Sequence, residues 1–321
     1  MLSRRSLIAA GLLAPVVARA QTASSGIVRI VNPFPAGGSS DAIARLLVPG
    51  LQQRLGATVI VENKPGASGS IGGAMVAKSP PDGLTWLLAA DSFVVSSLLM
   101  NNLPYDVQKD FIPVTMVARG AMVLCASPSR PYRTLADLIA AAKAKPDTLT
   151  YATTGIGSNG HLTMAALGQI TGARLVHVPY RGVAPASNDA IAGHVDLIIS
   201  STASLAPQIE AAQLRPVVQF GEKRAVFIPD TATAIESGFP SLHTYSWFGF
   251  FAPGGTPKEI VDRFYDAVAA TVREEAITNI LVNKYRTEVS LPTPEELRKE
   301  IAEELPFYAK IIQDNNIKGG T

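Results

Sequence analysis

The chain has 321 residues, more than a single hydrophobic core usually serves, so two lobes are expected. Its composition, 47% hydrophobic and 17% charged, is that of a globular protein and excludes a disordered one. The formal charge of +2 is small and no basic stripe is present, which argues against a nucleic-acid-binding protein.

The first twenty residues predict a signal peptide. Arg4 and Arg5 precede the apolar run 7–18, and Ala18-Arg19-Ala20 has the small-x-small form of a signal-peptidase site. The run is too short for a membrane anchor. Residues 3–8 also resemble a twin-arginine signal, so both export routes stay open. We therefore expect a periplasmic protein whose formal charge becomes −1 once the signal is removed.

Strands and helices alternate from the start of the mature chain. The apolar and turn-forming residues predict strand 27–31, a helix from Ser40, strand 58–61, a turn-rich loop 63–70 before another helix, a turn at 80–83 and strand 84–90. This alternation is typical of a parallel sheet with helices on its faces.

The pattern changes after Pro113, where strand 121–126 leads to a break at 127–131 that we interpret as the first crossing between lobes. The second lobe is predicted to contain helix 135–145, strand 149–153, helix 158–171, strand 175–178, helix 185–192 and strands 195–199 and 215–220. The aromatic cluster 245–251 indicates the return crossing, and apolar stripes predict helices over 260–272 and 297–312 that pack on the first lobe.

Two glycine-rich bends, each between a predicted strand and a predicted helix, are the candidate binding elements. They cover residues 33–41 (PFPAGGSSD) and 151–161 (YATTGIGSNGH). Glycine lets the backbone turn sharply and approach a ligand, and the first turn of a helix offers free N–H groups that attract anions. One bend in each lobe suggests a ligand held between them.

Catalytic chemistry finds little support in the sequence. Gly155-x-Gly157-x-x-Gly160 fits a dinucleotide fingerprint, but the acid expected about twenty residues later is absent from 176–180. Ser158 lacks a Gly-x-Ser-x-Gly frame, and the four histidines lack metal-ligand spacing. Cys125, the single cysteine, lies in an apolar run typical of a core position. We predict no enzyme, no catalytic residue, no metal and no cofactor.

Several short motifs occur in a characteristic order over nearly all of the mature chain. They are 33–41 with Ala44-Arg45, 61–67 (VENKPGA) with Gly69 and Gly72, 81–83 (PDG), 103–106 (LPYD) with Asp110-Phe111, 155–158 (GIGS) with His161, 178–182 (VPYRG), and Phe250, Ala252 and Pro253 with 255–257 (GTP). In their order and spacing they resemble the receptors of tripartite tricarboxylate transporters, often called Bug receptors.

The resemblance implies an α/β, two-lobed periplasmic-binding-protein fold (Venus-flytrap, type II-like) with doubly wound sheets and crossing strands. Residues 25–124 with 248–321 would form lobe 1, and 125–247 lobe 2. Such a solute-binding receptor closes on a small carboxylate and delivers it, as a monomer, to the permease subunits of its transporter. A receptor for a membrane sensor kinase and a hydrolase on the same fold remain as alternatives.

The resemblance also implies a set of ligand-binding residues. The two bends would hold the carboxylate through Ala36, Gly37, Gly38, Ser39, Ser40 and Asp41 on one side, and Thr154, Gly155, Ile156, Gly157, Ser158, Asn159 and His161 on the other. Tyr180 and Arg181 are further candidate ligand-binding residues. Arg181 would either supply a cation for the ligand or form a surface salt bridge. The far end of the pocket is expected to involve Ser92, Phe93, Ser200 and Trp247. Ser200 and Ser201 replace a family aspartate, which argues against an amino-acid ligand.

Overall fold

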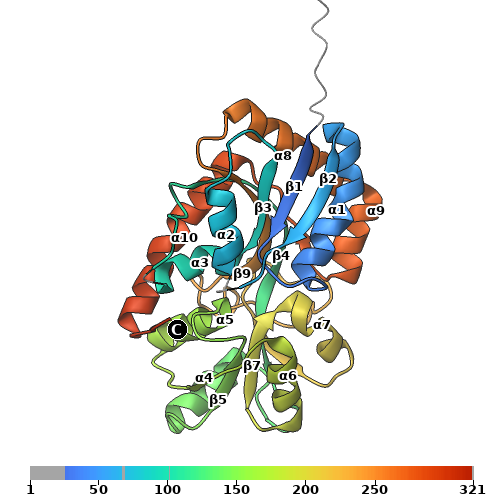
Figure 1. Ribbon diagram of the computed structural model, residues 1–321. Helices are drawn as coiled ribbons and strands as arrows, with labels where there is room; N and C mark the ends of the chain where they lie inside the picture. The colour runs from blue at the N-terminus through green and yellow to red at the C-terminus, as the bar shows by residue number, and fades with distance from the viewer. Residues whose placement is uncertain (1–25, 67–68, 101, 320–321) are drawn as a thin grey trace, which may run out of the picture.

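The computed structural model describes residues 26–66, 69–100 and 102–319. The predicted signal peptide 1–20, its cleavage site and Ala67 of the second motif lie outside these residues. No helix in the described ranges is both long enough and apolar enough to span a membrane. The predicted α/β periplasmic-binding-protein fold is confirmed, with two lobes joined by long strands (Figure 1).

Lobe 1 is built on a mixed sheet with the strand order β2-β1-β3-β9-β4. Its strands are β1 (Ile27–Asn32), β2 (Thr58–Asn63), β3 (Thr85–Ala90), β9 (Tyr245–Pro253), β4 (Phe111–Ala126) and, at the edge of β4, β10 (Glu288–Val289). The pairs of β1 with β2 and with β3 are parallel, whereas β9 is antiparallel to β3 and β4. Apolar side chains cover both faces, as expected for a sheet between helices.

Lobe 2 has a smaller sheet that shares the end of β4. Its other strands are β5 (Thr150–Thr153), β6 (Val176–Pro179), β7 (Leu197–Ser201) and β8 (Arg215–Gln219). β4 pairs with β7 and β8, and β5 lies between β7 and β6. Two further apolar clusters fill the space between this sheet and its helices.

The helices surround the two sheets (Figure 1). Those of lobe 1 are α1 (Ser39–Leu55), α2 (Ser70–Ala77), α3 (Asp91–Leu99), α8 (Lys258–Val272), α9 (Glu275–Asn279), the π-helix η2 (Ile280–Lys284) and α10 (Pro294–Asp314). Those of lobe 2 are α4 (Leu135–Ala144), α5 (Asn159–Thr171), α6 (Val183–Ala192) and α7 (Thr202–Glu210).

β4 carries the chain from one lobe to the other. It pairs with β9 from Phe111 to Ala121, and from Met122 onward with β7 and β8. The expected strand 121–126 was therefore too short, because the bulges near Pro113 hide the earlier part of the strand from a periodicity argument. The lobe boundaries at 124/125 and 247/248 stay a prediction; the change of strand partner lies a few residues before the first of them.

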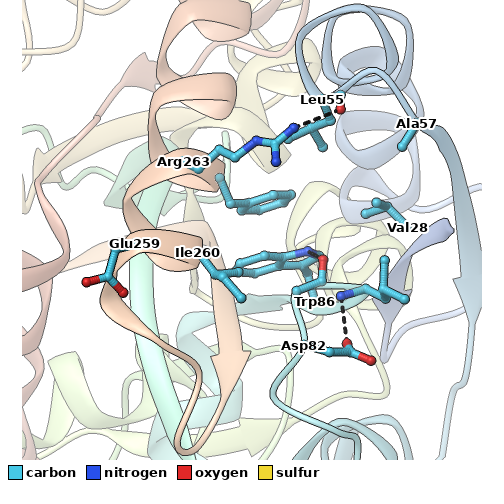
Figure 2. Close-up of a pocket in the computed structure, with 11 residues that line it drawn as sticks. Val28, Leu55, Ala57, Asp82, Trp86, Glu259, Ile260 and Arg263 are labelled. Carbon is cyan, nitrogen blue, oxygen red and sulfur yellow. Dashed lines mark hydrogen bonds between the residues drawn. The ribbon is translucent and has the colours of Figure 1, made fainter. Parts of the chain in front are cut away.

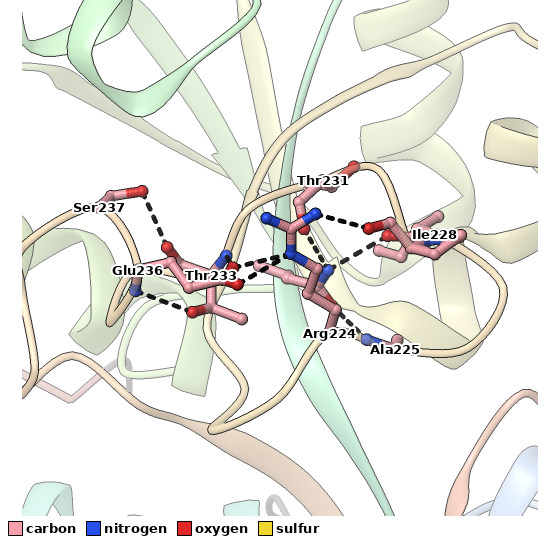
Figure 3. Close-up of polar contacts among 9 residues, drawn as sticks. Arg224, Ala225, Ile228, Thr231, Thr233, Glu236 and Ser237 are labelled. Atoms are coloured by element: carbon pink, nitrogen blue, oxygen red, sulfur yellow. Dashed lines mark hydrogen bonds and ion pairs between the residues drawn. The ribbon is translucent and has the colours of Figure 1, made fainter.

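A polar network holds the long connection between β8 and β9 (Figure 3). The fully buried amide of Gln219 donates from Nε2 to the carbonyls of Ile228 (3.2 Å) and Thr231 (2.6 Å), and its Oε1 accepts from the Ala225 N–H (2.7 Å). One side chain thus supplies the partners that a sheet or helix would otherwise give this backbone.

Gln219→Leu is expected to lower the free energy of unfolding by about 3 kcal/mol, because it leaves buried backbone groups without partners. Urea unfolding monitored by circular dichroism measures the change. Gln213→Leu, at an exposed position, is the matched control and should shift stability by less than about 0.5 kcal/mol. Equal stabilities for the two variants would contradict this account of the network.

Candidate functional site

The first bend joins β1 to α1 and is locked by Asp41. The N–H of Gly37, a residue at φ +83°, donates to Asp41 Oδ2 at 2.9 Å. Arg45 Nε donates to both carboxylate oxygens at 3.1 Å. The hydrogen bonds from Arg45 and then from the Gly37 N–H lower the pKa of Asp41 to about 2. Asp41 therefore shapes the bend, and the Gly37 N–H is already engaged in the described structure.

The start of α1 keeps donors for a ligand. Its N-cap residue, Gly38, offers no side chain, so no capping hydrogen bond satisfies the first N–H groups of the helix. Ser39 is exposed, whereas buried Ser40 turns inward and donates from Oγ to Asn32 Oδ1 at 3.0 Å. An uncapped helix start carries a partial positive charge that favours an anion.

The second bend, between β5 and α5, bonds mostly to itself. Gly155 and Gly157 have φ values of +141° and +73°. The Gly155 N–H donates to Thr153 Oγ1 (3.2 Å), Ser158 Oγ donates to the Gly155 carbonyl (2.8 Å), and the Gly157 N–H donates to His161 Nδ1 (3.1 Å). Two of its glycine N–H groups are therefore not free for a ligand in this structure.

His161 is part of a column of stacked rings beneath this bend. Its ring lies 3.8 Å from that of His177, which in turn lies 5.1 Å from Tyr151. Burial lowers the pKa of both histidines to about 4. His161 is thus neutral near pH 7, which leaves Nδ1 free to accept the Gly157 N–H.

A cavity of about 140 Å³ lies between the first turns of α1 and α7. Residues of both lobes and of the crossing strands line it: Ser39, Ile43, Gly120, Ser201, Ala203, Ser204, Ser246, Phe248, Lys284, Tyr285 and Thr287. Ser201 caps α7, and its Oγ lies 2.8 Å from Ser204 Oγ. The lining contains five hydroxyl groups besides that of Tyr285, one lysine and no acid, a combination suited to an anion.

The structure brings one predicted residue, Ser39, directly into this cavity. Other predicted residues are exposed near the carboxyl ends of the strands, namely Ala36, Gly37, Gly38, Ser92, Thr154, Ile156 and Arg181. The sequence argument missed Ser204, Ser246 and Lys284 as lining residues, and it considered Ser201 only as a departure from the family pattern. The signal for Ser201 was available, since a serine at the end of a buried strand is a common helix cap.

Four other predicted residues do not line this cavity. Ser200 is buried within β7 with 5% exposure, and the Tyr180 hydroxyl donates to Asp189 Oδ2 at 2.7 Å. Phe93 and Trp247 are 0% and 2% exposed in the core of lobe 1, so the expectation that they shape the far end of the pocket was wrong. Both are apolar and belong to the packing between sheet and helix.

Asn159, also predicted to bind ligand, ties the lobes together in the described structure. It is buried, its Nδ2 donates to the Tyr245 carbonyl at 2.7 Å, and its Oδ1 accepts from the Tyr308 hydroxyl at 3.5 Å. Nearby, Ser246 Oγ donates to Asp91 Oδ1 at 2.9 Å, while burial raises the pKa of Asp91. This junction links α5 of lobe 2 to β9 and α10.

Glu304 on α10 belongs to the same junction and gives it a pH dependence. Burial, followed by the charges of Glu300 and Asp91, raises its pKa from 4.5 to about 8. Folded chains then keep a proton that unfolded chains lose between these pH values, so stability falls as pH rises through that window.

We expect Glu304→Gln to remove most of this loss. Between pH 5 and pH 8 the variant should lose about 3 kcal/mol less stability than the unmodified protein, as the difference between the two pKa values requires. Urea unfolding at both pH values measures the difference, with exposed Glu303→Gln as control. Identical pH profiles for Glu304→Gln and the unmodified protein would contradict the raised pKa.

A family model described as the tripartite tricarboxylate transporter family receptor matches residues 43–317. The chain belongs to this receptor family. The resemblance inferred from the motifs is thereby confirmed. The matched segment contains the second bend and begins just after the first.

Individual proteins of known sequence or structure are similar over nearly the whole chain. Protein BugT of Bordetella pertussis is 33% identical over 311 residues, 96% of this chain and 94% of that protein. The structure of R. palustris Rpa4515 with adipate has a TM-score of 0.79 at 32% identity, covering 92% of this chain and 99% of that one. MatC from Rhodopseudomonas palustris with bound malate has a TM-score of 0.75 at 27% identity, covering 90% and 99%.

Another cavity lies in lobe 1, away from the carboxyl ends of its parallel strands (Figure 2). Its volume is about 310 Å³, and the stacked rings of Trp86 and Phe264, 3.7 Å apart, form its wall. Arg263 there donates to the Leu55 carbonyl at 3.1 Å. This cavity lies at the amino ends of β1 and β3, whereas ligands of open α/β sheets bind at the carboxyl ends. The cleft between the lobes is therefore the better candidate site.

Proposed function

We propose that this receptor works in the periplasm, captures a small carboxylate between its two lobes and delivers it to the permease subunits of a tripartite tricarboxylate transporter. The observation that carries the proposal is the acid-free, hydroxyl-lined cavity between the first turns of α1 and α7. The adipate and malate named for two similar receptors support the same class of ligand. No catalytic residue is proposed, and the ligand is expected to leave chemically unchanged.

Backbone and hydroxyl donors are sufficient for this binding. A carboxylate that accepts three or four charge-assisted hydrogen bonds gains roughly 1.5–3 kcal/mol from each. Three or four such bonds total about 5–12 kcal/mol, a range that includes the roughly 8 kcal/mol of micromolar affinity. The proposed donors are the free N–H groups at Gly38, Ser39 and Ser40 and the hydroxyls of Ser39 and Ser201.

Three glycines of the two bends shape the site and do not bind the ligand themselves in this proposal. Gly37, Gly155 and Gly157 act as positioning residues, because their N–H groups are engaged within the bends. Thr154 and Ile156 are exposed on the second bend. We propose that they contact the ligand from lobe 2.

Closure of the lobes follows from donors on both sides of the ligand. A ligand that moves a mostly open population to a mostly closed one must bind the closed form about ten-thousandfold better, roughly 5.5 kcal/mol. Only contacts completed by both lobes can provide such a difference. The cavity, lined by α1 on one side and α7 on the other, has this property.

Thermal-shift screening against a panel of carboxylates tests the proposal, with the corresponding neutral amides as controls. A ligand at a hundred times its dissociation constant should add about 2.7 kcal/mol of stability. We expect stabilisation by at least one carboxylate and none by its amide. A panel of aliphatic, hydroxy and aromatic acids that leaves the melting temperature unchanged would contradict the proposal.

A further inference from the structure

A basic side chain stands at the edge of the cavity between the lobes. Lys284 is the last residue of the π-helix η2 and lines the cavity beside Tyr285 and Thr287. The lysine is exposed, and its Nζ lies 5.7 Å from the centre of the Tyr285 ring. The hydroxyl-lined space between α1 and α7 is therefore bordered by a positive charge.

The backbone around this lysine has an unusual and well-held conformation. The Tyr285 N–H donates to the Ile280 carbonyl (3.1 Å), and the N–H and Oγ1 of Thr287 both donate to the Leu281 carbonyl (3.1 and 2.8 Å). Between them Arg286 has a left-handed φ of +53°. π-helices and left-handed non-glycine residues cost free energy and are frequent at functional sites.

Two basic residues near Lys284 are paired with acidic side chains. Arg286 pairs with Glu210 of α7 at 2.7 Å, and Arg119 lies 3.5 Å from Glu288. Within the part of the chain that the structure describes, Lys284 forms no ion pair. Its positive charge is therefore available to a ligand in the cavity.

We infer that Lys284 is a specificity-determining residue that pairs with a second anionic group of the bound solute. The inference rests on the proposed function, in which the first carboxylate is held at the helix starts. A solute with two anionic ends then gains a charge-assisted contact at Lys284 that a solute with one neutral end cannot form. A solute with one anionic end gains no such contact at Lys284.

The test compares each of three dicarboxylates, succinate, malate and adipate, with its monoamide by isothermal titration calorimetry. Lys284→Met removes the charge from the cavity edge. Lys78→Met is the matched control, because Lys78 is an exposed lysine at the end of α2 that does not line the cavity. Lys284→Arg retains the charge, and urea unfolding checks that each variant is folded.

We expect Lys284→Met to weaken the tightest-binding dicarboxylate about tenfold, which equals about 1.4 kcal/mol, and its monoamide less than twofold. Lys78→Met should change neither by more than twofold, and Lys284→Arg should retain most of the dicarboxylate affinity. An equal loss for dicarboxylate and monoamide would show that the lysine only steers anions, and no loss would also overturn the inference. If the unmodified protein binds no carboxylate at all, the proposed function itself fails.

Discussion

Valine at position 120 is expected to abolish carboxylate binding, by a hundredfold or more, without unfolding the protein. Gly120 lies on β4 and lines the cavity between the lobes. A Cβ at this position would lie 3.1 Å from Thr202 Oγ1 at the start of α7. The position is not among the glycines with positive φ, so a β-branched residue fits the strand backbone. Its methyl groups would fill part of the cavity and hold α7 away from α1.

Calorimetry with the carboxylate selected by the thermal-shift screen measures this effect, and urea unfolding monitors stability. Gly120→Ala provides a graded control, because its single methyl group adds less volume and should weaken binding only a few-fold. Unchanged affinity in Gly120→Val would remove the cavity from the binding site.

Gly157→Val is expected to lower both stability and affinity. An ideal Cβ on Gly157 would overlap the Cδ1 atom of Leu99 at the end of α3, and the φ of +73° is unfavourable for a β-branched residue. We expect about 3–5 kcal/mol less stability, from strain and overpacking together. Affinity should fall at least a hundredfold, because the second bend can no longer keep its shape against lobe 1.

A second variant separates the two causes of this effect. In Gly157→Val with Leu99→Ala the overlap is relieved while the backbone strain remains. The double variant should therefore be more stable than Gly157→Val alone, although affinity stays low. Urea unfolding and calorimetry on both variants decide the matter, and a Gly157→Val protein as stable as the unmodified one would show that the bend tolerates a side chain.

Most of the alternation of strands and helices could be predicted because its signals are local. Apolar runs bounded by glycine and proline define the strands, and the stripe of α8 has clear helical spacing. Helices α3 and α7 were missed. The apolar residues of α3 follow those of β3 without a breaking residue, and α7 is short and contains Pro207. These two helices bring Asp91 and Ser204 to the junction between the lobes.

The positions of the bends could be predicted from their glycines, but the hydrogen bonds within them could not be predicted from the sequence. In each bend a side chain four residues after a glycine accepts that glycine's N–H, Asp41 for Gly37 and His161 for Gly157. The spacing of four residues is present in the sequence, but only the structure shows that it corresponds to a hydrogen bond. Ser246 and Lys284 had no local signal, since only the folded crossing strands and the η2 segment place them beside α1.

A crystal structure of the protein without residues 1–20, bound to its tightest carboxylate, tests the central claim most directly. The account predicts a carboxylate between the first turns of α1 and α7 that accepts hydrogen bonds from N–H groups at Gly38–Ser40 and from the hydroxyl of Ser39 or Ser201. A carboxylate bound in the cavity of Figure 2, or held by one lobe while the other stays apart, would contradict it.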